Sequence, residues 1–153
     1  MSLKKAECLN TLKRRHSSDI AKLRNLVKND VGTKLSQSED DLYYLRYILS
    51  HPKELELASK NAGNSIVWRK DFSCSPKTRE EFQKNLRFEI VGTLDNGFLL
   101  VLVKPAIAVI RASDPKLLLE YLLGEREKIY QELSRLSRKT RTLVKCVMVY
   151  DAS

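Results

Sequence analysis

Two short apolar runs in the second half of the chain, with a long segment of helical periodicity between them, dominate the hydrophobic pattern. The runs are residues 98–103 and residues 144–150, and both are rich in β-branched side chains. Runs of this kind are typical of strands that are buried on both faces. Residues 115–139 carry leucine and isoleucine at helical spacing, which predicts a long helix between the strands. The order strand, helix, strand predicts two parallel strands joined by a right-handed crossover.

A β-hairpin is predicted immediately before this crossover. Apolar side chains alternate with polar ones from residue 86 to residue 90, and Asp95-Asn96-Gly97 has the composition of a tight turn. Residues 87–103 are therefore expected to form a half-exposed edge strand paired with a buried strand. Ser75-Pro76 and Asp114-Pro115 each combine a capping side chain with a proline, a pattern typical of helix starts.

The first half of the chain has the periodicity of three amphipathic helices. Apolar residues spaced three and four apart predict the first helix at residues 4–28. Ser38 can cap the second helix, which is expected to end at Pro52, and the same proline can occupy the first position of the third. The third helix is expected to reach Trp68. Gly63 lies inside it, where glycine either costs stability or permits close contact with another helix.

These elements predict a mixed α/β fold. An N-terminal helical subdomain is expected at residues 1–75, followed at residues 76–153 by a small mixed sheet with a long crossover helix. The helical subdomain carries tyrosines at positions 43, 44 and 47. Tyrosine can stack on nucleic acid bases, but beside a core stripe it more often packs with its hydroxyl group at the rim. We expect the packed arrangement here.

Composition and charge narrow the choice of partners. The formal net charge is +9, with +6 in residues 1–37, zero in residues 38–114 and +3 in residues 115–153. Basic chain ends can contact the phosphates of nucleic acids or of anionic lipids, although a solvated helix face explains the same charge. Lys13, Arg14 and Arg15 lie mostly off the apolar stripe of the first helix and are the candidates for contact with an anionic surface.

The cysteines and the hydropathy indicate a cytoplasmic protein. Cys8, Cys74 and Cys146 are far apart and form no CxxC pair, which is typical of reduced thiols rather than a disulfide or zinc framework. No apolar run approaches the roughly 20 residues that span a bilayer, and the charged N-terminus has no apolar segment after it that would mark a secretory signal.

No set of residues predicts catalysis. The chain has two histidines, His16 and His51, in different helical contexts, and it lacks a nucleophile elbow, a Walker loop, an HExxH motif and a dinucleotide fingerprint. Asp151 is the carboxylate best placed for a site, because ligands of α/β folds bind at the carboxyl ends of strands. A structural role for Asp151 is equally compatible with that position. We expect no enzymatic activity, no cofactor and no metal.

Several of these segments resemble the front part of CRAL-TRIO lipid-binding domains. Asp41-Leu42-Tyr43-Tyr44-Leu45-Arg46-Tyr47-Ile48, followed by Ala58 and by Trp68-Arg69-Lys70-Asp71-Phe72, is similar to the N-terminal helical part of that family. Gly97 matches a turn glycine, and residues 144–151 are similar to a strand that ends in aspartate. Leu49-Ser50-His51-Pro52-Lys53 replaces a basic turn of the family, and Phe98-Leu99 replaces an Arg-Pro pair. The resemblance covers residues 20–153 and only the front of the family domain, so residues 76–153 are expected to be truncated at the C-terminus.

The resemblance implies binding of a hydrophobic ligand, most plausibly a phospholipid such as phosphatidylinositol, and its transfer between membranes. Acyl chains would be buried against the sheet, and Val101, Val103, Val147 and Val149 are the candidate wall of the lipid pocket. The protein would then be cytoplasmic and peripheral to membranes. The alternative is a protein-interaction or scaffold module without a lipid pocket, and self-association through an uncovered sheet edge is a further expectation. Nucleic acid binding depends on charge alone, and we expect no nucleic acid partner.

Overall fold

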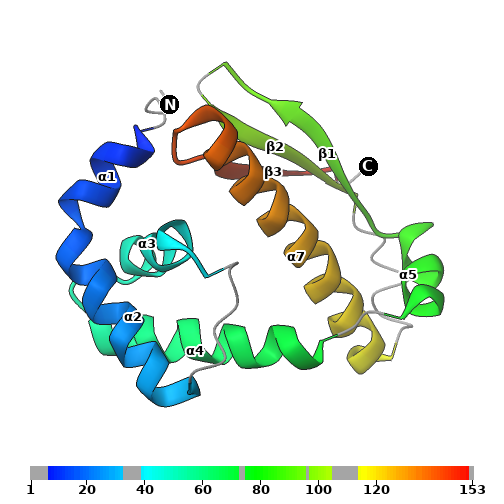
Figure 1. The fold of residues 1–153 in the computed structure, drawn as a ribbon. Helices are drawn as coiled ribbons and strands as arrows, with labels where there is room; N and C mark the ends of the chain where they lie inside the picture. The colour runs from blue at the N-terminus through cyan, green and yellow to red at the C-terminus, as the bar shows by residue number, and fades with distance from the viewer. Residues whose placement is uncertain (1–6, 33–38, 73–74, 96, 105–113, 152–153) are drawn as a thin grey trace. The chain divides into compact units, whose positions relative to one another are not determined.

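The chain has the mixed α/β fold that its sequence predicts, and it forms two compact units. One unit is Cys8–Phe72, and the other contains the residues from Ser75 to Asp151 together with Glu7 (Figure 1). The computed structural model describes residues 7–32, 39–72, 75–95, 97–104 and 114–151.

The first unit begins with two helices where the sequence predicts one. The helices α1 (Leu9–Arg15) and α2 (Ser17–Val31) meet at His16, whose φ of −107° and ψ of 17° leave the helical region. The prediction of a single helix over residues 4–28 was therefore wrong. Serine and aspartate favour helix starts over helix interiors, and the Ser17-Ser18-Asp19 sequence follows the break directly. The predicted apolar stripe is buried on both helices, at Leu9, Leu12, Ile20, Leu23 and Val27.

The next two helices, α3 (Asp41–Ser50) and α4 (Leu55–Asp71), also start later than predicted. The cap of α3 is Asp40, whose carboxylate Oδ1 accepts the Tyr43 N–H at 3.1 Å, while Ser38 lies outside the described residues. Pro52 does not begin α4, because Lys53 adopts a positive φ of 77°, a left-handed conformation that interrupts a helix.

Close packing of helices buries the tyrosines of α3. Tyr43 and Tyr44 are both buried, and the Tyr43 hydroxyl donates to the Ala62 carbonyl oxygen of α4 at 2.7 Å. Tyr43 and Tyr44 are packed as predicted and Tyr47 is half-buried, but the hydroxyls of Tyr43 and Tyr44 are inside the unit rather than at its rim. Beside Ala62, Gly63 allows α4 to approach α2, since a Cβ at this position would lie 3.1 Å from Cγ2 of Val31.

The second unit contains the predicted hairpin and the predicted parallel pair. The helix α5 (Pro76–Gln83) precedes β1 (Arg87–Thr93) and β2 (Phe98–Lys104), which pair antiparallel. The helix α7 (Pro115–Thr140) then leads to β3 (Lys145–Tyr150), which pairs parallel with β2, so the sheet order is β1-β2-β3. Side chains of Ser75 and Asp114 cap α5 and α7, as predicted, by accepting backbone N–H groups of Thr78 and Lys116.

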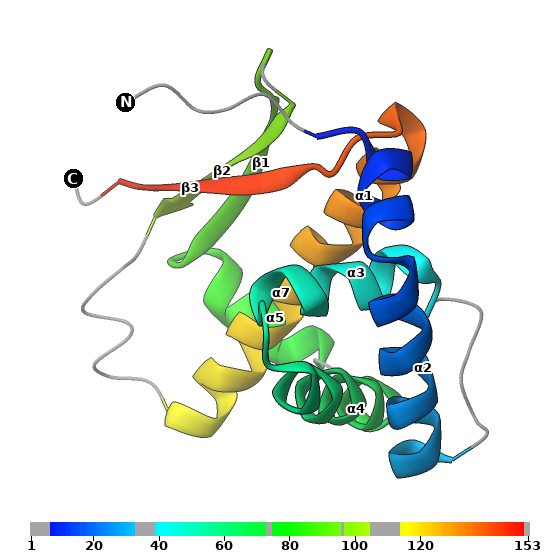
Figure 2. The ribbon, with the colours of Figure 1, turned by 90° about the vertical axis from the view of Figure 1, so that its left-hand side faces the viewer.

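The core of this unit lies between α7 and one face of the sheet. Alternate residues of β2, namely Leu99, Val101 and Val103, pack with Ile129 and Leu136 of α7. A second apolar cluster of Phe82, Leu86 and Tyr121 joins α5 to the first half of α7. Figures 1 and 2 show α7 running along one side of the sheet. No helix in the described part of the chain is both long enough and apolar enough to span a bilayer.

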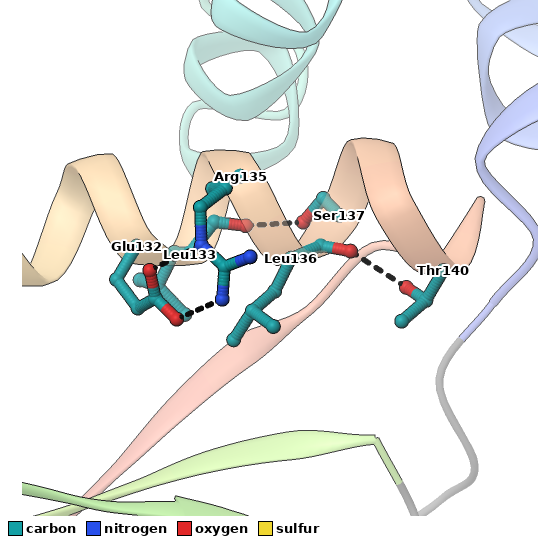
Figure 3. A network of polar contacts seen from close by, with 6 residues as sticks. All are labelled: Glu132, Leu133, Arg135, Leu136, Ser137 and Thr140. Carbon is teal, nitrogen blue, oxygen red and sulfur yellow. Dashed lines mark hydrogen bonds and ion pairs between the residues drawn. The ribbon is translucent and has the colours of Figure 1, made fainter.

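A buried serine connects the end of α7 to the start of β3, and Figure 3 shows its bond to the Leu133 carbonyl on the helix. The Ser137 hydroxyl donates to the Leu133 carbonyl at 2.7 Å and accepts the Val144 N–H at 3.0 Å. One turn later, the Thr140 hydroxyl donates to the Leu136 carbonyl at 2.9 Å, but Thr140 is exposed. Arg141 then ends the helix in a left-handed conformation with φ 55°. Ser137 therefore supplies a hydrogen-bond acceptor for the Val144 N–H at the point where the chain turns from α7 into β3.

Replacing Ser137 by alanine is expected to lower the free energy of unfolding of this unit by about 1–3 kcal/mol, because the buried Val144 N–H loses its acceptor. Thr140→Ala removes a bond of the same kind at an exposed position and should change stability by less than about 1 kcal/mol. Chemical unfolding curves give both values, and amide hydrogen exchange should accelerate at Val144 only in the first variant. Equal losses in the two variants would contradict the role assigned to Ser137.

Alkaline pH should destabilise the first unit through Tyr43. Burial, and secondarily the neighbouring Tyr47, raise the pKa of Tyr43 above its usual value near 10. The unfolded chain then releases the phenolic proton at a lower pH than the folded chain does, so stability is lost as pH rises above about 10. Tyr43→Phe cannot ionise, and its stability should fall less steeply between about pH 10 and 11.5. If this is incorrect, the free energies of unfolding of the wild type and of Tyr43→Phe, plotted against pH, would give parallel curves.

Candidate ligand-binding surface

The face of the sheet that points away from α7 is largely apolar. Because side chains alternate along a strand and register partners in neighbouring strands share a face, residues 98, 100 and 102 of β2 lie beside residues 145, 147 and 149 of β3. Neither apolar cluster formed by α5 and α7 in this unit includes a side chain of this face. We call it the outer sheet face, and its apolar members are Phe98, Leu100, Leu102, Val147 and Val149.

The four valines predicted to line a lipid pocket lie on opposite faces. Val101 and Val103 are fully buried in the core against α7. Val147 and Val149 belong to the outer sheet face, where Val147 is half-buried and Val149 is 46% exposed. The structure therefore does not bring the four residues together, and of the four only Val147 and Val149 remain as candidates for ligand contact.

A polar cavity of about 540 Å³ lies where α5, β1 and α7 meet, and sequence reasoning missed it. Two aromatic residues, Phe88 and Tyr121, line it. Tyr121 stacks on Phe82 with ring centroids 5.4 Å apart and donates from its hydroxyl to the Leu86 carbonyl at 2.6 Å. The rest of the lining combines carboxylates with cationic and amide groups, which are Glu80, Gln83, Lys84, Arg87, Glu89 and Glu125.

The charges around this cavity limit what it can do. Glu125 is buried and forms an ion pair with Lys128 on the same helix, so its charge is already compensated. Groups of histidine, cysteine and carboxylate side chains that could hold a metal ion are absent from the described residues. A cavity with this density of charge is unsuited to acyl chains, whose burial requires an apolar lining. The apolar outer sheet face is the better candidate for a hydrophobic ligand.

The basic residues predicted to contact an anionic surface form the last turn of α1. Arg14 and Arg15 are exposed and Lys13 is half-buried, and positive charge at this position also favours the negative end of the helix. The adjacent His16 lies 3.7 Å from the Asp19 carboxylate and belongs to the junction between α1 and α2. Lys13, Arg14 and Arg15 thus place three consecutive positive charges on one helical turn, where they also stabilise the C-terminal end of α1.

The remaining polar candidates have structural partners. The Asp151 carboxylate lies 3.6 Å from the Lys104 ammonium, and its N–H donates to the Val103 carbonyl, so it ties the end of β3 to β2. His51 closes α3 through the Tyr47 carbonyl and also contacts the Asn61 amide at 3.0 Å. Cys8 and Cys146 are free thiols, while Cys74 lies outside the described residues.

Comparison with known proteins leaves the family open. The sequence matches no protein-family model, and no curated protein is significantly similar to it. The likeness to CRAL-TRIO domains therefore stays a prediction that depends on the residues quoted above.

Truncation of valines on the two faces should lower the free energy of unfolding by different amounts. Val101→Ala is expected to lower the free energy of unfolding by about 2 kcal/mol, because it opens a cavity in the core against α7. Val149→Ala removes the same atoms from a side chain that is half exposed and should cost less than about 1 kcal/mol. Denaturant unfolding of the two variants measures the difference. Similar losses would mean that Val149 is as deeply packed as Val101.

Proposed function

We propose that this protein is a non-catalytic binding domain that holds a hydrophobic ligand, a phospholipid such as phosphatidylinositol, against the outer sheet face. The observation that carries the proposal is the presence of an apolar face on a sheet whose helical cover α7 lies on the other side. Apolar area that is removed from water by a ligand contributes about 25 cal/mol per Å². Val149 is 46% exposed and the other four side chains of the face are half-buried, so the exposed part of these five side chains is the area that a ligand can cover. Acyl chains match this surface because they need no polar partner.

Transfer of the lipid between membranes is the process that the resemblance to CRAL-TRIO domains implies. In support, the last turn of α1 presents Lys13, Arg14 and Arg15, and each basic residue near an anionic bilayer contributes about 1 kcal/mol to adsorption. Phosphatidylinositol is anionic, so the same residues favour membranes that contain it. In this mechanism the basic turn contributes to adsorption on the bilayer, the outer sheet face binds the acyl chains, and no covalent chemistry is involved.

A second candidate function, protein interaction, is supported by β3. This strand lies at the edge of the sheet and has large exposed apolar side chains, with Met148 40% exposed and Tyr150 65% exposed. Edge strands with these properties pair readily with another strand. A module of this kind would bind protein without carrying lipid.

Lipid transfer can be measured with donor vesicles that contain a fluorescent phosphatidylinositol and with unlabelled acceptor vesicles. The wild-type protein should accelerate transfer and carry lipid after removal of the vesicles, whereas Val149→Glu should lose most of both because a charge enters the apolar face. Leu57→Glu is the matched control, because Leu57 is 41% exposed on α4, in the other unit, and this variant should behave as wild type.

The basic turn gives a second arm of the same experiment. Replacing Lys13, Arg14 and Arg15 together by glutamine should slow transfer to anionic acceptor vesicles and leave transfer to neutral phosphatidylcholine vesicles unchanged. A wild-type protein that is folded, binds no phospholipid and accelerates no transfer would refute the lipid proposal and favour the protein-interaction module.

A further inference from the structure

The two edges of the sheet differ in how they resist pairing with another strand. In β1, the charged residues Arg87 and Glu89 and the bulge between Ile90 and Gly92 interrupt a regular edge. These are the usual protections of an edge strand. β3 has a single charged residue, Lys145 at its first position, while residues 146–150 contain no charge and no proline and their register with β2 is regular. Among the described residues β3 pairs only with β2.

The hydrogen bonds to β2 determine which backbone groups of β3 point outward. The Asp151 N–H donates to the Val103 carbonyl at 2.9 Å, which places residue 151 among those that face β2. Backbone groups alternate in direction along a strand, so residues 145, 147 and 149 also face β2. The N–H and C=O groups of Cys146, Met148 and Tyr150 therefore point away from the sheet.

Only one register lets all three outward residues pair with a second copy of the same strand. In an antiparallel pair centred on Met148, Met148 lies opposite Met148 of the second copy, and Cys146 lies opposite Tyr150. Each of these pairs exchanges two N–H···O=C bonds. A shift of two residues in one direction would place Tyr150 opposite Val144, whose N–H already donates to Ser137. A shift in the other direction would place Cys146 opposite residue 152, which is not part of β3 (Lys145–Tyr150).

The same register makes the side chains of the outer sheet face complementary. Val147 lies opposite Val149 of the second copy, and Lys145 lies opposite Asp151. The two-fold symmetry repeats both pairs. Two Val147–Val149 pairs therefore lie near the centre of the contact, and one Lys145–Asp151 ion pair lies at each end. Asp151 lies 3.6 Å from Lys104 of its own copy, and the second copy would add Lys145 on its other side. Opposite charges and β-branched side chains are favourable cross-strand pairs.

We infer that β3 is a homodimerisation edge, at which two copies of this chain pair antiparallel about a two-fold axis at Met148 and join their sheets into one. The contact is isologous, so each copy contributes the same residues and the assembly closes at two copies. This association does not require lipid, and it can be measured in the absence of any membrane.

Light scattering after size-exclusion chromatography, across a range of concentrations, gives the first test. The wild-type protein should reach about twice the 17.6 kDa of one chain, and the transition gives a dissociation constant. Met148→Pro should abolish the dimer, because it removes an outward N–H and places a bulky ring on the edge without touching a bond to β2. Met148→Ala keeps the N–H and should retain the dimer. A wild-type protein that stays monomeric at all concentrations overturns the inference, as does a dimer that survives Met148→Pro.

Charge exchange tests the register. Lys145→Asp alone places aspartate opposite Asp151, and Asp151→Lys alone places lysine opposite Lys145, so each variant should raise the dissociation constant about tenfold. A mixture of the two single variants restores opposite charges at both ends and should form a heterodimer with near-wild-type affinity. Circular dichroism of each variant establishes that it is folded. Single variants that dimerise as wild type, or folded variants that fail to complement, would overturn this register.

Discussion

The packing of β2 against α7 is the constraint on which the second unit depends. Leu99, Val101 and Val103 point from the central strand into the core, and both neighbouring strands take their position from β2. Because side chains alternate along a strand, burying these three residues turns Leu100 and Leu102 to the opposite side. The outer sheet face is thus a direct consequence of how the core is built, since β2 is apolar at nearly every position and only one of its faces meets α7.

Much of the fold can be predicted from local sequence patterns. The hairpin, the long helix after Asp114-Pro115 and the two parallel strands follow from apolar runs, turn residues and capping side chains that lie close together in sequence. Helix boundaries in the first unit could not be predicted as well. The break at His16 interrupts an apolar stripe that continues unchanged on α2, and the start of α4 depends on the left-handed conformation of Lys53, a residue that carries no turn signal of its own.

The candidate site was only partly predictable for a different reason. Val101 and Val149 look alike in sequence, and only the placement of α7 decides which of them is core and which faces outward. The polar cavity has no sequence pattern, because Glu80, Arg87 and Glu125 come from three elements that meet only in the folded unit. Conversely, Asp151 occupies a position that suggests a site in an α/β fold, yet its contacts with Lys104 and Val103 show how such a carboxylate can serve the sheet itself.

The bulge in β1 has a consequence for how this sheet can grow. At Gly92, with φ 149°, the strand departs from regular geometry, so the free edge of β1 is a poor template for a further strand. A sheet with two regular edges could add copies without limit and propagate into a fibre. Of the two edges of this sheet, only the edge at β3 is regular. If two copies pair at β3 as proposed, the joined sheet would have an irregular β1 edge on either side, so the bulge at Gly92 would limit the assembly to a finite size.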